Sequence, residues 1–138
     1  MEPYNEKNPP TRRPHPGITP SFRHAFEGLR YVVRAERNAR IHLCAAVLVV
    51  LLSSWLGLKP VEWALVIAAI ALVFAGEMLN TVVELTIDLI TSQEHPIAKR
   101  AKDVAAGAVL VAAIAAAIIG FLVLGPALFH KLTGYGIP

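Results

Sequence analysis

The chain has 138 residues, which is enough for one domain, and a formal net charge of +3 at pH 7. Hydrophobic residues make up 55% of it and charged residues 17%, whereas soluble domains have about 45–50% and about 25%. This balance excludes a conventional soluble enzyme and a disordered chain. The single cysteine, Cys44, excludes a disulfide framework and a cysteine-based metal site. The net charge is too small to indicate nucleic-acid binding, and we expect no nucleic-acid partner.

Residues 1–20 hold six of the ten prolines, with asparagine, lysine and arginine between them. Such a segment cannot bury enough apolar surface to offset the entropy lost on ordering, which predicts a flexible tail. It lacks the apolar core of a cleaved secretory signal. Residues 21–138 are then expected to form one membrane-embedded domain.

A helix is predicted from Thr19, with Thr19 as N-cap and Pro20 as the first helical residue. Apolar residues then recur at helical spacing and form one stripe: Phe22, Phe26, Leu29 and Val33. The arginines lie mostly on the other faces. This pattern is typical of an amphipathic helix in the membrane interface. A helix packed on its own soluble protein is the alternative.

Three apolar segments follow, at about 41–58, 63–90 and 104–129. Roughly 20 helical residues cross a hydrocarbon core of ~30 Å, so each segment is long enough to span a membrane or nearly so. The predicted fold is an all-α integral membrane protein with an N-terminal interfacial helix and three transmembrane helices.

Lysine and arginine indicate the orientation of these spans. Eight of the 13 precede Ile41, and Lys99, Arg100 and Lys102 lie between the second and third spans. Positive residues concentrate on the cytoplasmic side, so the N-terminus and the second connection are expected inside and the C-terminus outside.

The second span carries acidic residues that are unusual in a membrane. Glu77, Asn80, Glu84 and Asp88 are offset by 3, 7 and 11 residues and share one helix face. An unpaired carboxylate in the bilayer costs at least ~2.5–3.5 kcal/mol, so such residues usually mark functional sites. The alternative is that they pair with arginines and hold helices together.

Three further charged residues are expected at the same membrane level and could converge on Glu84: Glu36, Lys102 and Asp103. Clustered carboxylates suit Mg²⁺, and a lysine suits a phosphate group. Taken singly, Glu36 could instead be a solvated partner of Arg40, and Lys102 a positive-inside anchor. No P-loop, nucleophile elbow or zinc-protease motif occurs, and the histidines show no metal-ligand spacing. A proton- or ion-coupled transporter remains the competing class, although the second span shows no helix break.

The string from Glu77 to Asp88, Glu-Met-Leu-Asn-Thr-Val-Val-Glu-Leu-Thr-Ile-Asp, resembles the signature of the prokaryotic diacylglycerol kinase family. Ala101-Lys102-Asp103, Gly28-Leu29-Arg30 and Glu36-Arg37-Asn38 resemble its other blocks. The likeness covers about residues 21–129. The Glu36 block and the segment 95–103 look closer to the Gram-positive undecaprenol kinases, which phosphorylate a polyprenyl alcohol, than to the diacylglycerol kinases.

The resemblance implies a homotrimer in the bacterial inner (cell) membrane, with sites between subunits, that uses ATP and Mg²⁺ to phosphorylate a lipid alcohol. It implies Glu77 as catalytic base and Glu36 and Glu84 as Mg²⁺ ligands. The implied nucleotide contacts are His24, Glu36, Asn80, Glu84, Gln93, Glu94, His95, Lys102 and Asp103. The implied lipid contacts are Phe26, Arg30, Glu77 and Ala106.

Overall fold

The computed structural model describes residues 18–134, and its regular structure consists of four helices. These are α1 (Ile18–Ala35), α2 (Arg37–Leu56), α3 (Pro60–Ile90) and α4 (Pro96–Thr133). The all-α prediction is therefore confirmed for this part of the chain. Most of the predicted tail lies outside the described residues.

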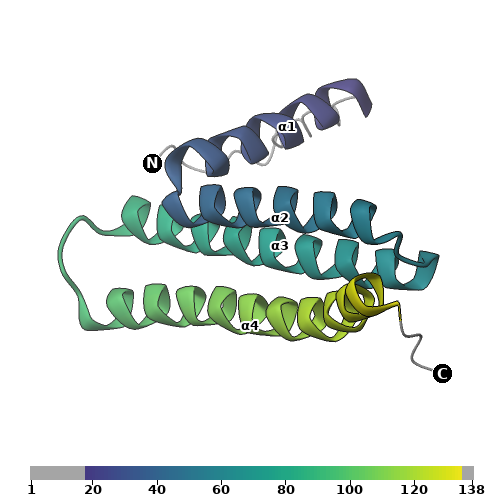
Figure 1. Cartoon of the computed structure of the whole chain (residues 1–138). Helices are drawn as coiled ribbons and strands as arrows, with labels where there is room; N and C mark the ends of the chain where they lie inside the picture. The colour runs from purple at the N-terminus through teal and green to yellow at the C-terminus, as the bar shows by residue number, and fades with distance from the viewer. Residues whose placement is uncertain (1–17, 135–138) are drawn as a thin grey trace.

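The three long helices α2, α3 and α4 run side by side, and α1 folds back over α2 (Figure 1). The α1–α2 junction at Glu36 and the α3–α4 connection, residues 91–95, lie at the same end of this bundle. We call this the junction end. The α2–α3 connection and the C-terminus of α4 lie at the other end. Most of the candidate functional residues thus lie in segments that meet at the junction end: the start of α2, the C-terminal half of α3 and the start of α4.

Local chemistry sets the helix boundaries. Glu36 has extended backbone, with φ −94° and ψ 125°, and separates α1 from α2. Gly57 ends α2 in the left-handed region at φ 73°, which glycine adopts without steric cost. His95 precedes Pro96 and caps α4 by accepting a hydrogen bond from the Ile97 amide at 3.2 Å. The predicted cap at Thr19 is wrong, because α1 already begins at Ile18.

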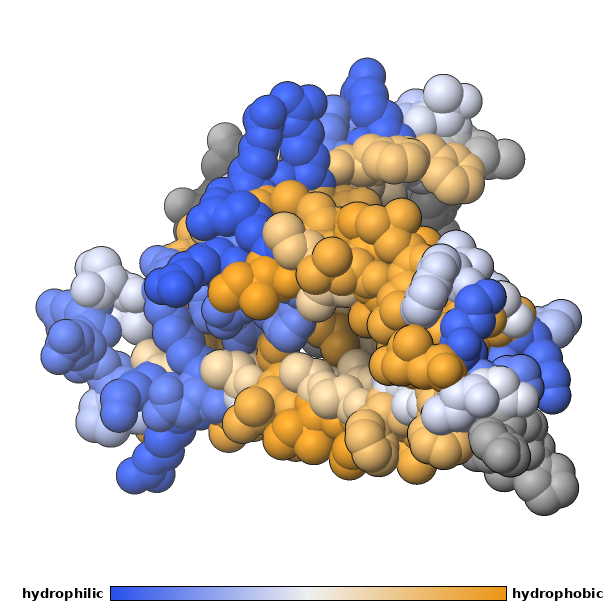
Figure 2. All heavy atoms as spheres, viewed as in Figure 1, coloured by the Kyte–Doolittle hydropathy of each residue, from blue (hydrophilic) through white to orange (hydrophobic). Residues whose placement is uncertain are grey.

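Helices α2, α3 and α4 are each long and apolar enough to cross a membrane. With 31 and 38 residues, α3 and α4 are about 46 and 57 Å long, well beyond a core of ~30 Å. Figure 2 shows apolar side chains across the middle of one face, with hydrophilic side chains over the junction end and along α1. The chain is therefore a membrane protein whose third and fourth helices are longer than a bilayer core is thick.

The packed interior of the single chain is thin. Its apolar cluster lies at the end away from the junction and consists of Leu56, Leu58, Val66 and Val123. Nearer the junction end, Gly76 allows α3 to approach the backbone of Val109 on α4. Large apolar side chains elsewhere on the spans are mostly exposed, as expected of helices that face lipid or other subunits.

Candidate active site

Polar residues, rather than apolar ones, are the most buried part of α3 near the junction end. Glu77, Asn80 and Thr81 are 2%, 8% and 3% exposed. Thr81 is satisfied locally, because its hydroxyl donates to the Glu77 carbonyl at 3.0 Å. Counting back from Ile90, Glu77 lies about 20 Å and Glu84 about 9 Å from the end of the helix. Glu77 is therefore the deepest carboxylate of the predicted row.

The Glu77 carboxylate lies within a set of charged groups from different helices. His42 of α2 approaches it, with Nε2 at 3.4 Å from Oε1. Glu36 and Glu84 are close enough for their charges to act on Glu77 as well. Oε1 has no hydrogen-bond partner, although it is buried. A buried acceptor without a partner is costly in an ordinary core, so this oxygen is available to an incoming donor.

Asn80 and Glu84 form a second polar unit one turn further toward the junction end. The Asn80 amide nitrogen donates to Glu84 Oε1 at 2.7 Å and holds that carboxylate in place. The amide oxygen of Asn80 is buried and lacks a hydrogen-bond partner. Among the described residues no three histidine, cysteine or acidic side chains form a ready-made metal cage. Two carboxylates, Glu36 and Glu84, nevertheless fit Mg²⁺, which commonly takes one or two carboxylates and completes its shell with water and phosphate oxygens.

Two contacts of the junction end correct sequence-based expectations. Lys102 donates to Asp88 rather than converging on Glu84, so Asp88 joins α3 to α4. Arg40 donates to the Arg34 carbonyl at 2.9 Å, not to Glu36. Asp103 lies 3.9 Å from Lys99 on its own helix, and its predicted role remains a prediction. The physical reason is that a long basic side chain can reach several oxygens at one level, and the packing of the helices selects the partner.

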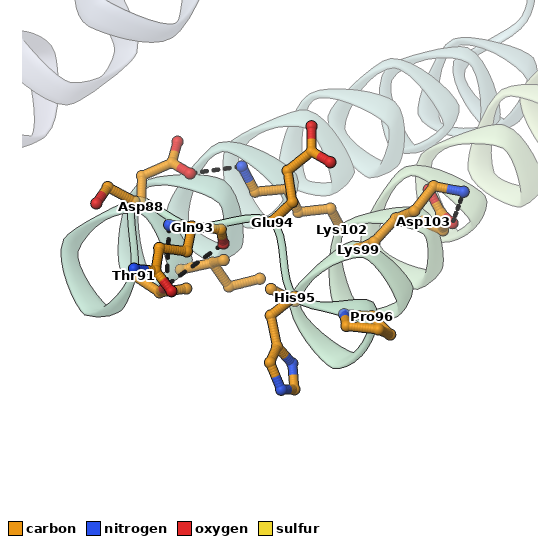
Figure 3. Close-up of a pocket in the computed structure, with 12 residues that line it drawn as sticks. Asp88, Thr91, Gln93, Glu94, His95, Pro96, Lys99, Lys102 and Asp103 are labelled. Carbon is orange, nitrogen blue, oxygen red and sulfur yellow. Dashed lines mark hydrogen bonds and ion pairs between the residues drawn. The ribbon is translucent and has the colours of Figure 1, made fainter.

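A pocket of about 880 Å³ opens between the end of α3 and the start of α4. Its lining includes the two ion pairs just described and the connecting residues Gln93, Glu94 and His95. Figure 3 shows Asp88 and Lys102 in direct contact beside the pocket, whereas the His95 ring points away from them. The two lysines that line this pocket, Lys99 and Lys102, are of the kind that bind phosphate groups.

Comparison with known proteins places this site in a family. The model of "Prokaryotic diacylglycerol kinase" matches residues 23–124. The chain belongs to the prokaryotic diacylglycerol kinase family. It is 44% identical to the undecaprenol kinase of Bacillus subtilis over 108 residues, 78% of this chain and 88% of the relative. It is also 44% identical to a diacylglycerol kinase of Synechocystis over 118 residues, 85% of this chain and 67% of the relative. The Escherichia coli diacylglycerol kinase is 35% identical over 95 residues, 69% of this chain and 78% of the relative.

Membership makes the chain a membrane-embedded lipid kinase that takes ATP as co-substrate. The sequence motifs predicted a lipid kinase of this family, and that prediction is confirmed. The matched range includes all of α2 and α3, most of α1 and α4, and every candidate residue from Glu36 to Asp103.

The candidate residues of α1 lie apart from the buried set of this lipid kinase. His24 pairs with Glu27 at 3.2 Å on the exposed surface. Phe26 is 69% exposed, and Arg30 is exposed too. Ala106 on α4 is likewise exposed. Their predicted roles toward nucleotide and lipid remain predictions.

Sequence reasoning missed His42. It was grouped with histidines that lack metal-ligand spacing, yet it is the residue that contacts Glu77 from α2. A signal was present: His42 is an ionisable residue inside the first apolar segment, and such residues mark functional sites as readily as buried acids do.

Proposed function

We propose that this lipid kinase transfers the γ-phosphate of ATP to undecaprenol and forms undecaprenyl phosphate. The observation that carries the kinase site is Glu77, a carboxylate 2% exposed on a membrane-length helix. Its burial, its depth and the lack of a hydrogen-bond partner at Oε1 suit a group that accepts a proton from a lipid hydroxyl. Undecaprenol is favoured because the Bacillus subtilis relative, aligned over 88% of its length, is named an undecaprenol kinase.

The proposed reaction follows from the depths of the groups. The polyprenyl chain stays in the bilayer, and its hydroxyl reaches the level of Glu77 from the membrane side. Glu77 takes the hydroxyl proton while the alcohol oxygen attacks the γ-phosphorus. The bond from phosphorus to the β–γ bridging oxygen breaks, and ADP leaves with that oxygen. Phosphoryl transfer depends mainly on positioning and charge stabilisation, which side chains from three helices can supply.

The nucleotide would lie at the junction end, with its phosphates toward Lys102 and the acidic residues. Lys102 would exchange Asp88 for a phosphate oxygen, and Asn80 would keep Glu84 oriented through the 2.7 Å hydrogen bond. Glu36 and Glu84 would hold Mg²⁺, which neutralises phosphate charge when bound. Asp103, Gln93, Glu94, His95 and His24 remain proposed nucleotide contacts, and Phe26, Arg30 and Ala106 proposed lipid contacts.

We also propose a homotrimer in the bacterial inner membrane, with the junction end in the cytoplasm. The positive residues before Ile41 and in 99–102 support this orientation. The extensive exposed apolar surface and the thin interior of one chain support association. A site completed by a neighbouring subunit would also exclude water better than three helices can alone.

Diacylglycerol is the second candidate acceptor, because the Synechocystis relative, at the same 44% identity, is named a diacylglycerol kinase. A transporter is disfavoured, because α3 runs from Pro60 to Ile90 as one unbroken α-helix.

The test is transfer of labelled γ-phosphate from ATP by detergent-purified protein, with undecaprenol and diacylglycerol in parallel micelles. The proposal predicts a higher kcat/KM for undecaprenol and a loss of activity when Mg²⁺ is chelated. A preference for diacylglycerol would reassign the acceptor and leave the site intact. Transfer to neither acceptor would contradict the proposed function.

A further inference from the structure

His42 links the proposed base to a second helix. It lies on α2 five residues after Arg37, about 7.5 Å along the helix from its start at the junction end. Its Nε2 is 3.4 Å from Oε1 of Glu77 on α3, and the two side chains are 25% and 2% exposed. Within residues 18–134, His42 makes this one ion-pair contact.

On one side, His42 borders an apolar cavity. His42 lines a cavity of about 220 Å³ between α2, α3 and α4, and its remaining lining residues are alanine, valine, isoleucine, phenylalanine and glycine. A polar ring in such a setting gains most of its electrostatic stabilisation from its one charged neighbour. The contact is therefore expected to fix the ring and the carboxylate relative to each other.

The charges around Glu77 make this contact consequential. Glu36 and Glu84 both act on Glu77 with the same sign, and His42 is the basic group among the described residues that offsets them. ATP would bring further negative charge to the same region. Without His42, the Glu77 carboxylate would be repelled by the acidic groups and attracted by no basic group in the described part of the chain. It would then lose the orientation that proton abstraction requires.

We propose that His42 is a positioning residue for phosphoryl transfer, holding the Glu77 carboxylate toward the lipid hydroxyl. This inference rests on the proposed role of Glu77 as the base. The 3.4 Å separation is longer than a well-formed hydrogen bond. The contact therefore acts on Glu77 through charge and position, and it leaves Oε1 free to accept a hydrogen bond from the substrate.

The test compares His42→Leu and His42→Gln with the wild type in steady-state kinase assays. His42→Leu removes the polar contact and should lower kcat by about 10–100-fold, while KM for ATP and for the lipid changes by no more than about threefold, since misplacing a reacting group costs up to about 10². His42→Gln keeps an N–H donor at similar reach and should recover most of the rate. His130→Leu, at the far end of α4, is the matched control and should leave kcat unchanged.

Glu77→Gln separates this inference from the function on which it rests. If His42 acts through Glu77, adding His42→Leu to Glu77→Gln should not reduce the residual rate further. An equal fall in both backgrounds, or a normal kcat in His42→Leu beside an inactive Glu77→Gln, would overturn the inference alone. A near-normal rate in Glu77→Gln would overturn the role of the base itself.

A spectroscopic measurement covers the case in which His42→Leu does not fold. The imidazole ¹⁵N signals of His42 in wild-type protein should shift when Glu77 is replaced by glutamine, and those of His130 should not. Unchanged His42 signals would show that the contact is absent and would overturn the inference.

Discussion

Gly76 provides a direct test of the packing that holds the proposed base against α4. A Cβ atom built on Gly76 would lie 3.7 Å from Val109 Cα, 3.8 Å from Val109 Cγ2 and 3.9 Å from Ala112 Cβ. These are ordinary van der Waals separations, so alanine fits without displacement. A longer side chain that continues in this direction has no such room and must push α3 and α4 apart beside Glu77.

The expected magnitudes follow from this geometry. Gly76→Ala should leave the free energy of unfolding unchanged or raise it by up to about 1 kcal/mol, because alanine is the better helix former. Gly76→Leu should lower it by about 1–3 kcal/mol through overpacking. It should also reduce kcat, because Glu77 is the next residue and moves with the helix.

Unfolding in mixed detergent, followed by circular dichroism, measures the stability, and the kinase assay measures kcat on the same samples. Gly125→Leu is the control, since no heavy atom lies within 4 Å of a Cβ atom at that position. Wild-type stability and kcat in Gly76→Leu would refute the close approach of α3 to α4. If Gly76→Ala lowered the free energy of unfolding by more than about 1 kcal/mol, the conclusion that a Cβ atom fits at this position would be refuted.

Three further variants test other parts of the structure. Glu84→Gln should raise the Mg²⁺ concentration for half-maximal activity or abolish activity, and an unchanged Mg²⁺ titration would remove the metal role. Asp88→Asn should change the free energy of unfolding by less than about 1 kcal/mol, because its ion pair with Lys102 is largely exposed; a larger loss in detergent unfolding would show a stronger link. Glu62→Ala removes the carboxylate that accepts from the Lys59 amide at 2.6 Å and should cost about 0.5–1 kcal/mol with kcat unchanged; loss of kcat at unchanged stability would contradict a purely structural cap.

The features that the sequence predicted well are those set by local patterns. Apolar segments of membrane length predicted the three spans, and the helical period put Glu77, Asn80 and Glu84 on one face. Each of these features depends on residues a few positions apart.

The features that the sequence did not predict depend on contacts between helices. Lys102 could reach several acids at one membrane level, and only the packing of α3 against α4 determines that it meets Asp88. The approach of His42 to Glu77 likewise requires α2 to lie against α3 in one register. Helical periodicity gives the direction of a side chain from its own helix but not the neighbour that it meets.

The measurement that tests the central claim most directly is the turnover of Glu77→Gln in purified, folded protein with ATP, Mg²⁺ and undecaprenol. Glutamine keeps the volume of glutamate but cannot act as the base. We expect kcat to fall by about 10²–10⁴, which corresponds to about 3–5 kcal/mol in the activation barrier. The free energy of unfolding should stay the same or rise, because a neutral amide replaces a buried carboxylate. Turnover close to the wild-type value in a stably folded Glu77→Gln would contradict the account.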